Sequence, residues 1–158
     1  GGNLNGKMHG KGIYTYADGS SYDGQFENNL MHGKGIYTWA DGSSYDGQFE
    51  NNMFNGDAYY NRVSDGLTYI GTFKRHEFHG KGTSKWSDGT SYSGDWKYGK
   101  MDGIGKIYYP NSVYYKGEFK NDLKHGQGVN TWPDGKRYKV VYRNDDLISK
   151  DRLINTSD

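Results

Sequence analysis

Four histidines recur at matching places in the sequence and are the first residues that could form a metal site. Each stands directly before a Gly-x-Gly pair. Zinc needs donors about 2.0–2.1 Å from the ion. Successive copies of the repeat described below would lie about 9.6 Å apart, which is too far for neighbouring copies to share one ion. We therefore predict a structural role for these histidines and no metal or other cofactor. The four are His9, His32, His79 and His125.

Catalytic groups are not brought together by any recognisable pattern. The aspartates of the Asp-Gly pairs have the type and position of turn residues, and turns spread along one edge do not form the paired carboxylates of acid–base catalysis. The chain has no Cys, no identifiable Ser-His-Asp set, and no Gly-Lys-Ser/Thr that would complete a phosphate-binding loop. We expect that this segment is not an enzyme. The aspartates are Asp18, Asp41, Asp88 and Asp134.

The composition is poor in aliphatic residues and rich in glycine and tyrosine. The 158 residues are 32% apolar and 16% aromatic, with 25 Gly and 16 Tyr. Soluble domains average about 45–50% apolar residues, so this chain cannot build a thick aliphatic core. The net charge of +1 argues against a dedicated nucleic-acid binder. The lack of Cys fits a reducing compartment, and we expect a cytoplasmic location.

The chain is an internal repeat with a period of 23 residues. Residues 7–26 and 30–49 are nearly identical, and a motif Tyr-x-Gly-x-Phe/Trp recurs at spacings of 23 or 24. A degenerate sixth copy begins at Tyr138. The single inserted residue falls near Asp65. The five regular copies begin at Tyr22, Tyr45, Tyr69, Tyr92 and Tyr115.

The period suits two short strands and two turns. Residues 13–16 and 22–26 are rich in β-branched and aromatic residues, as strands are. Ala17-Asp18-Gly19 between them reads as a three-residue hairpin loop, and Asn28-Asn29 as a two-residue type I′ turn. Arg75-His76 fits that turn less well and is expected to be looser. The fold class is therefore all-β: a single-layer antiparallel meander of about six hairpins.

Alternation of side chains places glycines and aromatic residues on one face. The loop length pairs Tyr14 with Tyr22 and Gly12 with Gly24, so that a ring covers bare backbone across the strands. The opposite face is largely polar. A flat sheet would leave the aromatic face in water, which soluble proteins rarely tolerate. We therefore predict a curved and twisted sheet with an aromatic trough.

The Tyr-x-Gly-x-Phe/Trp, His-Gly-x-Gly and Asp-Gly motifs at this period resemble MORN repeats over residues 5–143. The resemblance implies a twisted, curved run of β-hairpins. It also implies non-catalytic arrays that hold partner proteins, often in cytoskeletal, ciliary or membrane-contact assemblies, or that target a larger enzyme such as a phosphoinositide kinase or a methyltransferase. The sequence departs from the pattern at residues 55–58, Asp102, residues 111–112 and Val140.

Two parts of the chain are distinguished. Residues 1–143 are predicted to form the array, with the first repeat incomplete, and residues 144–158 a C-terminal cap or tail. Asp145 or Asp146 could cap a short helix there. Such a helix would cover the last hairpin, form a homodimer or lead into another domain. It would present Leu147, Ile148, Leu153 and Ile154.

The trough is predicted to bind an extended or helical segment of another protein. Its candidate residues are aromatic or Met side chains on the aromatic face. Several of them vary between copies, which makes them less tied to the fold. The candidates are Tyr37, Trp39, Phe54, Tyr60, Phe78, Trp86, Met101, Tyr109 and Trp132.

Charge is distributed unevenly along the chain. Residues 1–73 hold 4 basic and 8 acidic side chains, whereas residues 97–143 hold 10 basic and 4 acidic ones. The basic third is a candidate docking patch for an acidic partner or for anionic phospholipid, where each charge contributes on the order of 1 kcal/mol. Its residues are Lys116, Lys120, Lys124, Lys136, Arg137, Lys139 and Arg143.

Overall fold

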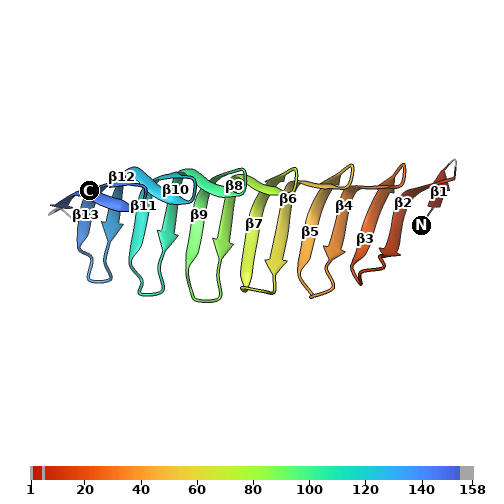
Figure 1. Cartoon of the computed structure of the whole chain (residues 1–158), viewed down its shortest axis with the longest axis horizontal. Helices are drawn as coiled ribbons and strands as arrows, with labels where there is room; N and C mark the ends of the chain where they lie inside the picture. Colours follow the sequence, from red (N-terminus) through yellow and green to blue (C-terminus); the bar gives the residue numbers. More distant parts are fainter. Residues whose placement is uncertain (1, 5, 154–158) are drawn as a thin grey trace. The chain divides into compact units, whose positions relative to one another are not determined.

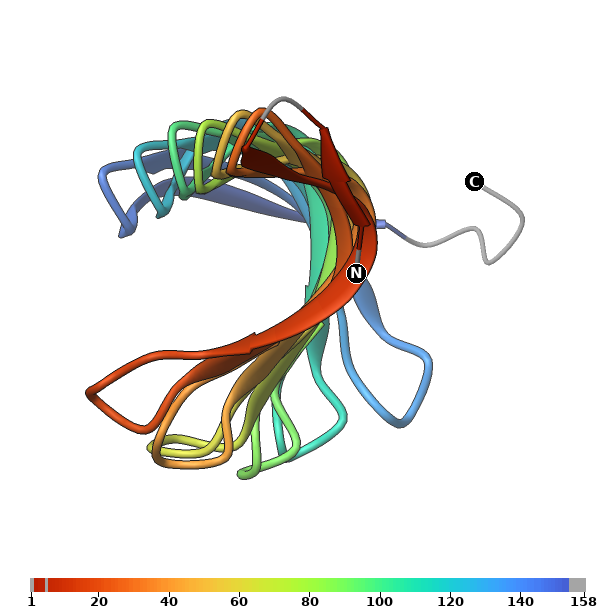
Figure 2. The same cartoon turned by 90° about the vertical axis from the view of Figure 1, so that its right-hand side faces the viewer.

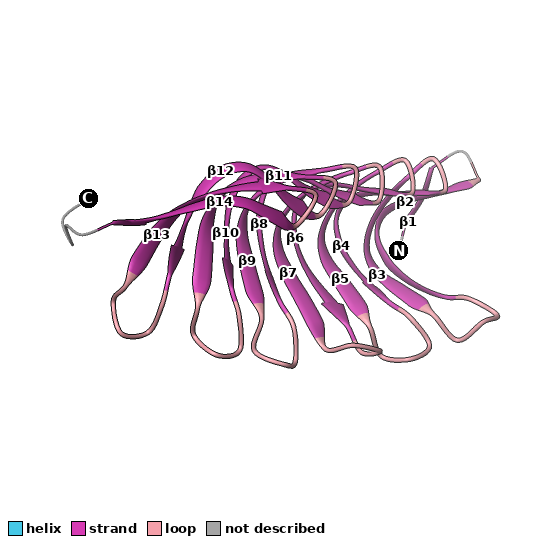
Figure 3. Ribbon diagram, turned by 60° about the vertical axis from the view of Figure 1, so that its left-hand side comes forward, coloured by secondary structure: helices cyan, strands magenta, loops and turns pink. Residues whose placement is uncertain are grey.

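The computed structural model describes residues 2–4 and 6–153. Within that part, the chain forms fourteen β-strands and no helix (Figure 3), so no helix there could span a membrane. The chain divides into two compact units, Gly1–Phe78 and His79–Asp158, called unit 1 and unit 2 below. In each unit the strands form one open layer and bend along their length (Figure 2).

Each strand of a unit pairs antiparallel with the next strand in the sequence (Figure 1). The strands of unit 1 are β1 (Gly2–Leu4), β2 (Lys7–Thr15), β3 (Ser21–Glu27), β4 (Leu30–Thr38), β5 (Ser44–Glu50), β6 (Met53–Arg62) and β7 (Leu67–Lys74). The strands that follow are β8 (Glu77–Lys85), β9 (Ser91–Lys97), β10 (Lys100–Tyr108), β11 (Tyr114–Lys120), β12 (Leu123–Thr131), β13 (Arg137–Arg143) and β14 (Asp146–Leu153). The predicted all-β meander is confirmed.

The register between β2 and β3 is the one that the loop length predicts. Gly12 lies opposite Gly24, and Tyr14 lies opposite Tyr22. Glycines and aromatic rings therefore share a face. The same face carries the buried aromatic core, because Tyr22 is 0% and Phe26 6% exposed.

Between β3 and β4 the pairing contains a β-bulge that the sequence pattern does not reveal. Gly24 pairs with Gly35, but Phe26 pairs with Met31, so β4 carries two extra residues opposite Gln25. Gly33 lies in this bulge with a φ of 83°, and a side chain there would collide with Gln25. Equivalent shifts occur between β5 and β6, β9 and β10, and β11 and β12. Bulges of this kind bend a strand and increase its twist.

A buried tyrosine holds each bulge. The ring of Tyr22 lies across Gly24 and Gly35, where a Cβ on either glycine would collide with it. Its hydroxyl donates a hydrogen bond to the carbonyl oxygen of Gln25 at 2.7 Å. The same bond joins Tyr45 to Gln48, Tyr69 to Thr72, Tyr92 to Asp95 and Tyr115 to Glu118, at 2.5 to 3.0 Å. All five tyrosines are 0% exposed.

Each of these tyrosines also connects neighbouring repeats. The Tyr22 ring packs edge-on against Phe26 of its own repeat and Phe49 of the next, with both ring centroids 5.0 Å away. In unit 2, Tyr92 packs in the same way on Trp96 and Phe119. The core of each unit is thus a chain of aromatic rings inside the bend of a single layer.

The two-residue turns join neighbouring repeats through backbone hydrogen bonds at the edge opposite the longer loops. Asn29, at a φ of 66°, donates its amide to the carbonyl of Met8 and accepts the amide of Met8 on its side-chain oxygen. The Arg75-His76 turn was expected to be looser. It adopts the same positive φ values, 48° and 71°, and His76 contacts the backbone of Phe54 in the same two ways.

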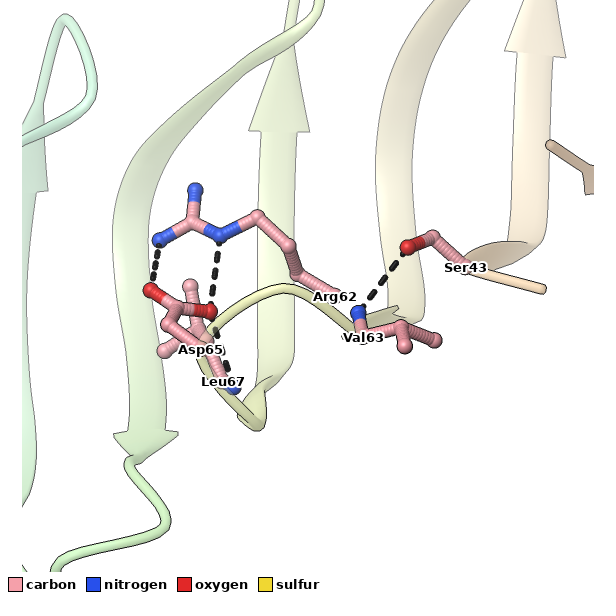
Figure 4. Close-up of polar contacts among 5 residues, drawn as sticks. All are labelled: Ser43, Arg62, Val63, Asp65 and Leu67. Atoms are coloured by element: carbon pink, nitrogen blue, oxygen red, sulfur yellow. Dashed lines mark hydrogen bonds and ion pairs between the residues drawn. The ribbon is translucent and has the colours of Figure 1, made fainter. Parts of the chain in front are cut away.

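The loop between β6 and β7 contains the predicted insertion near Asp65. Arg62 donates two hydrogen bonds to the Asp65 carboxylate, at 2.9 and 2.7 Å, and the Leu67 amide donates a third at 3.1 Å (Figure 4). These bonds, led by those from Arg62, lower the pKa of Asp65 to about 2. The Val63 amide binds the Ser43 hydroxyl at 2.9 Å, which fastens the loop to the preceding repeat.

The optional C-terminal helix is wrong, because Asp146–Leu153 forms β14. Asn144 and Asp145 adopt φ values of 47° and 69° and make another two-residue hairpin turn. The Asp145 carboxylate accepts the Lys124 amide at 2.7 Å and so acts like Asn29, not as a helix cap. Ile154 lies outside the described residues.

Removing one tyrosine hydroxyl tests its role at the bulge. We expect Tyr92→Phe to lower the free energy of unfolding by about 1–3 kcal/mol, because a buried carbonyl loses its partner. The matched control is Tyr108→Phe, at a side chain that is 40% exposed. Urea unfolding of both variants measures the difference. Equal stability of the two variants would contradict the assignment.

Alkaline pH should unfold the protein through the same tyrosines. Burial raises the pKa of Tyr22 and of Tyr115 to about 12, and it also raises the pKa of Tyr45, Tyr69 and Tyr92. In the unfolded chain a tyrosine titrates near pH 10. The folded state thus holds these protons more tightly, so stability is full below about pH 10 and falls as the pH rises toward 12.

Tyrosinate absorbance and circular dichroism, recorded together, measure this titration. We expect the buried tyrosines to ionise only as the strand signal disappears. Ionisation of every tyrosine near pH 10 in a chain that keeps its strand signal would show that burial does not protect them.

Candidate functional site

Each unit has two distinct faces. The inner face is the one that carries the five buried tyrosines, and the outer face is its opposite. A single layer can bury rings only inside its bend (Figure 2). Eight of the nine predicted binding residues lie on the aromatic, inner side by register or by ring contacts. The ninth, Trp86, follows β8 and continues the alternation of Ser84, which lies opposite Tyr92 on the inner side.

In unit 1, four of these residues form one cluster. The Trp39 ring lies 5.0 Å from Tyr37, 5.7 Å from Phe54 and 5.9 Å from Tyr60, between ring centroids. Phe54 is 8% exposed and stacks on Tyr45 at 3.9 Å, so it belongs to the core. Tyr37, Trp39 and Tyr60 remain half-buried.

Phe78 extends the same row of rings. It stacks on Tyr69 at 4.0 Å and lies 5.9 Å from Tyr60. The stacking resembles that of Phe54 on Tyr45 and points to a core role for part of its surface. The structure therefore brings Tyr37, Trp39, Phe54, Tyr60 and Phe78 together, and it leaves all of them except Phe54 half-buried.

In unit 2 the predicted residues are spread out. Trp86 follows β8, Met101 is the second residue of β10 and lies opposite Trp96, and Tyr109 follows β10. All three are half-buried. Trp132 follows β12, is 36% exposed and lies 5.3 Å from Tyr138. These side chains form a broad aromatic surface and not one cluster.

The structure divides the predicted basic patch between two faces. Lys116, Arg137 and Lys139 lie on the outer face of β11 and β13. Lys124 lies on the inner face, opposite Phe119. Lys136 lies in the loop before β13, with its ammonium 3.6 Å from the Asp134 carboxylate. Lys120 and Arg143 are the last residues of β11 and β13. Both are exposed and lie on the outer face.

Sequence reasoning missed Lys106, which lies directly opposite Lys116 on the outer face. Its ammonium lies 4.3 Å from the ring centroid of Tyr114 and 4.8 Å from that of Tyr108. Within the described residues neither lysine forms an ion pair, and like charges directly across a strand pair are destabilising. The parity of the strand could have identified this pair.

The outer face of unit 1 is more apolar than predicted. Ile13, Ile36 and Tyr59 are 75%, 42% and 44% exposed. They alternate with Asp23 and Asp46 along one cross-strand row. Ile13 and Ile36 were visible in the sequence as equivalent residues of two repeats, but their partners across the strands were not.

Two of the four recurrent histidines accept hydrogen bonds from the short turns. The ring nitrogen Nδ1 of His32 accepts the Asn51 amide at 3.4 Å, and that of His125 accepts the Asn144 amide at 3.1 Å. Asp102 accepts the Asn121 amide in the same slot, which explains why an aspartate can replace histidine there. Among the described residues, no three His, Asp or Glu side chains are grouped as metal ligands would be.

Comparisons with known proteins agree with the repeat architecture. A family model described as MORN repeat matches residues 4–21, 22–44, 45–56, 69–91, 92–113 and 115–137, which together exceed half of the chain. The search of curated proteins found no match. One solved structure with similarity is the SAS-4 (dCPAP) TCP domain of Drosophila melanogaster, in complex with a proline-rich motif of Ana2 (dSTIL). It is 18% identical, with 92% of this chain and 90% of that chain covered and a TM-score of 0.42.

Proposed function

This chain belongs to the MORN-repeat family, and we propose that it is a non-catalytic scaffold whose inner faces bind an extended or helical segment of a partner protein. The observation that carries the proposal is the set of half-buried aromatic residues around Trp39 and at Trp86 and Tyr109, together with the exposed Trp132. We place such a scaffold in a cytoskeletal, ciliary or membrane-associated assembly of the cytoplasm.

The half-buried rings are separate from those that the fold requires. Tyr22 and its four equivalents are fully buried and bind the bulge backbone. Trp39 and Trp86 instead begin the longer loops that follow β4 and β8. Their backbone groups form the hydrogen bonds of these turns. An aromatic residue stands there in five copies, as Tyr16, Trp39, Trp86, Tyr109 and Trp132.

Half-buried aromatic residues are well suited to bind a second chain. Covering their remaining surface stabilises a complex by about 25 cal/mol per Å² of apolar area. Trp and Tyr are enriched among the residues that dominate binding energies, and they lose little entropy on ordering. An amphipathic helix or an extended segment can present apolar side chains to such a surface.

Truncating two inner-face tryptophans tests the proposal. We expect the double variant Trp39→Ala/Trp86→Ala to bind captured partners at least about tenfold more weakly, since truncation of such anchors costs about 2 kcal/mol or more. The matched control Ile13→Ala/Ile70→Ala removes exposed apolar residues from the outer face. Affinity capture from native cells, read by mass spectrometry, compares the two. Urea unfolding confirms that both variants fold, and full recovery of every partner by the tryptophan variant would reject the proposal.

A second candidate function is binding of anionic phospholipid through the outer face of unit 2. This function is favoured by the cross-strand pair of Lys106 and Lys116. Their like charges repel each other, and among the described residues no acidic side chain forms an ion pair with either lysine. Arg137 and Lys139 extend the same face. An anionic headgroup would relieve the repulsion between the two lysines.

Vesicle sedimentation tests this candidate. Binding to vesicles that contain phosphatidylserine should weaken with added salt and with Lys106→Gln/Lys116→Gln, because each charge contributes on the order of 1 kcal/mol. Lys136→Gln, in the loop beside Asp134, is the control, to be compared with each of the two single substitutions. Binding that ignores both the salt and the double substitution would eliminate this mechanism.

A further inference from the structure

The inner face of unit 2 differs in charge from that of unit 1. Along β2–β7, the register defines one charged inner-face residue, Arg62 opposite Leu67, and its charge is paired with Asp65; the other inner-face positions hold uncharged residues. Along β12–β14, the register places Lys124, Lys150 and Arg152 on the inner face. The described inner-face positions of β8–β14 hold no Asp or Glu.

Lys124 occupies a slot that is apolar in the other copies. The slot opposite the repeat's Phe or Trp holds Met31, Phe54 and Met101 in three other repeats. The fold therefore does not require a charge there. A lysine in this slot places an ammonium group where the neighbouring repeats present a thioether or a ring.

Aromatic side chains hold the Lys124 ammonium on the inner face. Its Nζ lies 4.3 Å from the ring centroid of Tyr142, 5.4 Å from that of Tyr109 and 5.7 Å from that of Tyr115. Burial opposes the charged form, but the hydroxyls of Tyr109 and Tyr142 raise the pKa of Lys124 above its ordinary value. The group is thus a cation at neutral pH. Cation–π contacts of this kind fix its position and contribute about 0.5–2 kcal/mol.

Lys150 forms a second site of the same type. The pairing of Val140 with Lys150 puts this side chain on the inner face of β14. Its Nζ lies 4.2 Å from the ring centroid of Tyr138 and 5.5 Å from that of Trp132. Arg152 stands opposite Tyr138 on the same face.

Acidic residues near these cations are already used elsewhere. Asp145 accepts the backbone amide of Lys124 and not its ammonium. Asp151 lies opposite Lys139 on the outer face. Within the described residues neither Lys124 nor Lys150 forms an ion pair, so both ammonium groups rest on rings without a counter-charge.

From this arrangement we infer that the inner face over β12–β14 recognises carboxylate side chains of a partner segment whose apolar residues lie over β8–β10. The inference rests on the proposed function and names the chemistry of the partner. Lys124 and Lys150 are two strands apart, about 9.6 Å across the sheet, so a single carboxylate cannot serve both. The segment carries at least two Asp or Glu residues near one end, and their position sets its direction on unit 2.

A displayed library of random peptides, selected on the full chain, tests the inference. Lys124→Met/Lys150→Gln removes the two inner-face lysines that rest on rings and keeps Arg152, and the methionine repeats what Met31 and Met101 provide in the same slot. Lys116→Gln/Lys139→Gln removes the same charge from the outer face and is the matched control. We expect the native and control chains to select peptides enriched in Asp and Glu, and the inner-face variant to lose that enrichment. A selected peptide should bind the inner-face variant about fivefold more weakly, as expected for two partly exposed charge pairs.

The outcomes separate this inference from the proposed function. Acid-poor peptides on the native chain, or enrichment that survives Lys124→Met/Lys150→Gln, would overturn the inference. If a parallel Trp86→Ala variant no longer binds those peptides, the proposed function stands without the inference. Failure to select any peptide would overturn both. The inference would also be overturned if the inner-face variant lost only its binding to phosphatidylserine vesicles, because the cations would then serve a membrane.

Discussion

A buried tyrosine that lies over small residues on two paired strands holds every regular repeat of this protein together. Gly24 and Gly35 leave this room for the ring of Tyr22, and Gly47 opposite Ala58 leaves it in the next repeat. The Tyr22 hydroxyl needs an acceptor at the bulge, which the Gln25 carbonyl supplies. Without a second layer of structure, this contact is what removes the five tyrosine rings from water. The Tyr-x-Gly-x-Phe/Trp motif therefore encodes one packing arrangement, in which the tyrosine, the glycine and the second aromatic residue depend on one another.

Features determined by local spacing could be predicted from the sequence, and features determined across strands could not. Loop length fixes which residues of β2 and β3 are opposite, so the Gly12–Gly24 and Tyr14–Tyr22 pairs were predictable. The bulges were not, because alternation looks the same with or without two extra residues opposite Gln25. The C-terminal segment was also ambiguous. Asp145 has the type of a helix cap, and only its contact with Lys124 shows that it closes a hairpin.

The same distinction applies to the candidate site. Side-chain parity identified the inner-face aromatic residues, but it did not separate Phe54, which stacks on Tyr45, from Trp39, which remains half-buried. Counting charges along the chain suggested one basic patch. The strand pairing instead sends Lys116 to the outer face and Lys124 to the inner one. A charge count ignores the alternation that decides which surface each lysine joins.

The repeat also explains how binding chemistry can vary without loss of the fold. Because Tyr22 and its equivalents carry the core of each repeat, the slot before the His-Gly pair has freedom in its side chain. Met31 and Phe54 fill it with apolar groups, whereas Lys124 fills it with a cation resting on Tyr142. The backbone at this slot is held by the next short turn in each case, through Asn52 for Met31 and Asp145 for Lys124. A scaffold of this kind can change what one repeat recognises while the neighbouring repeats keep the same geometry.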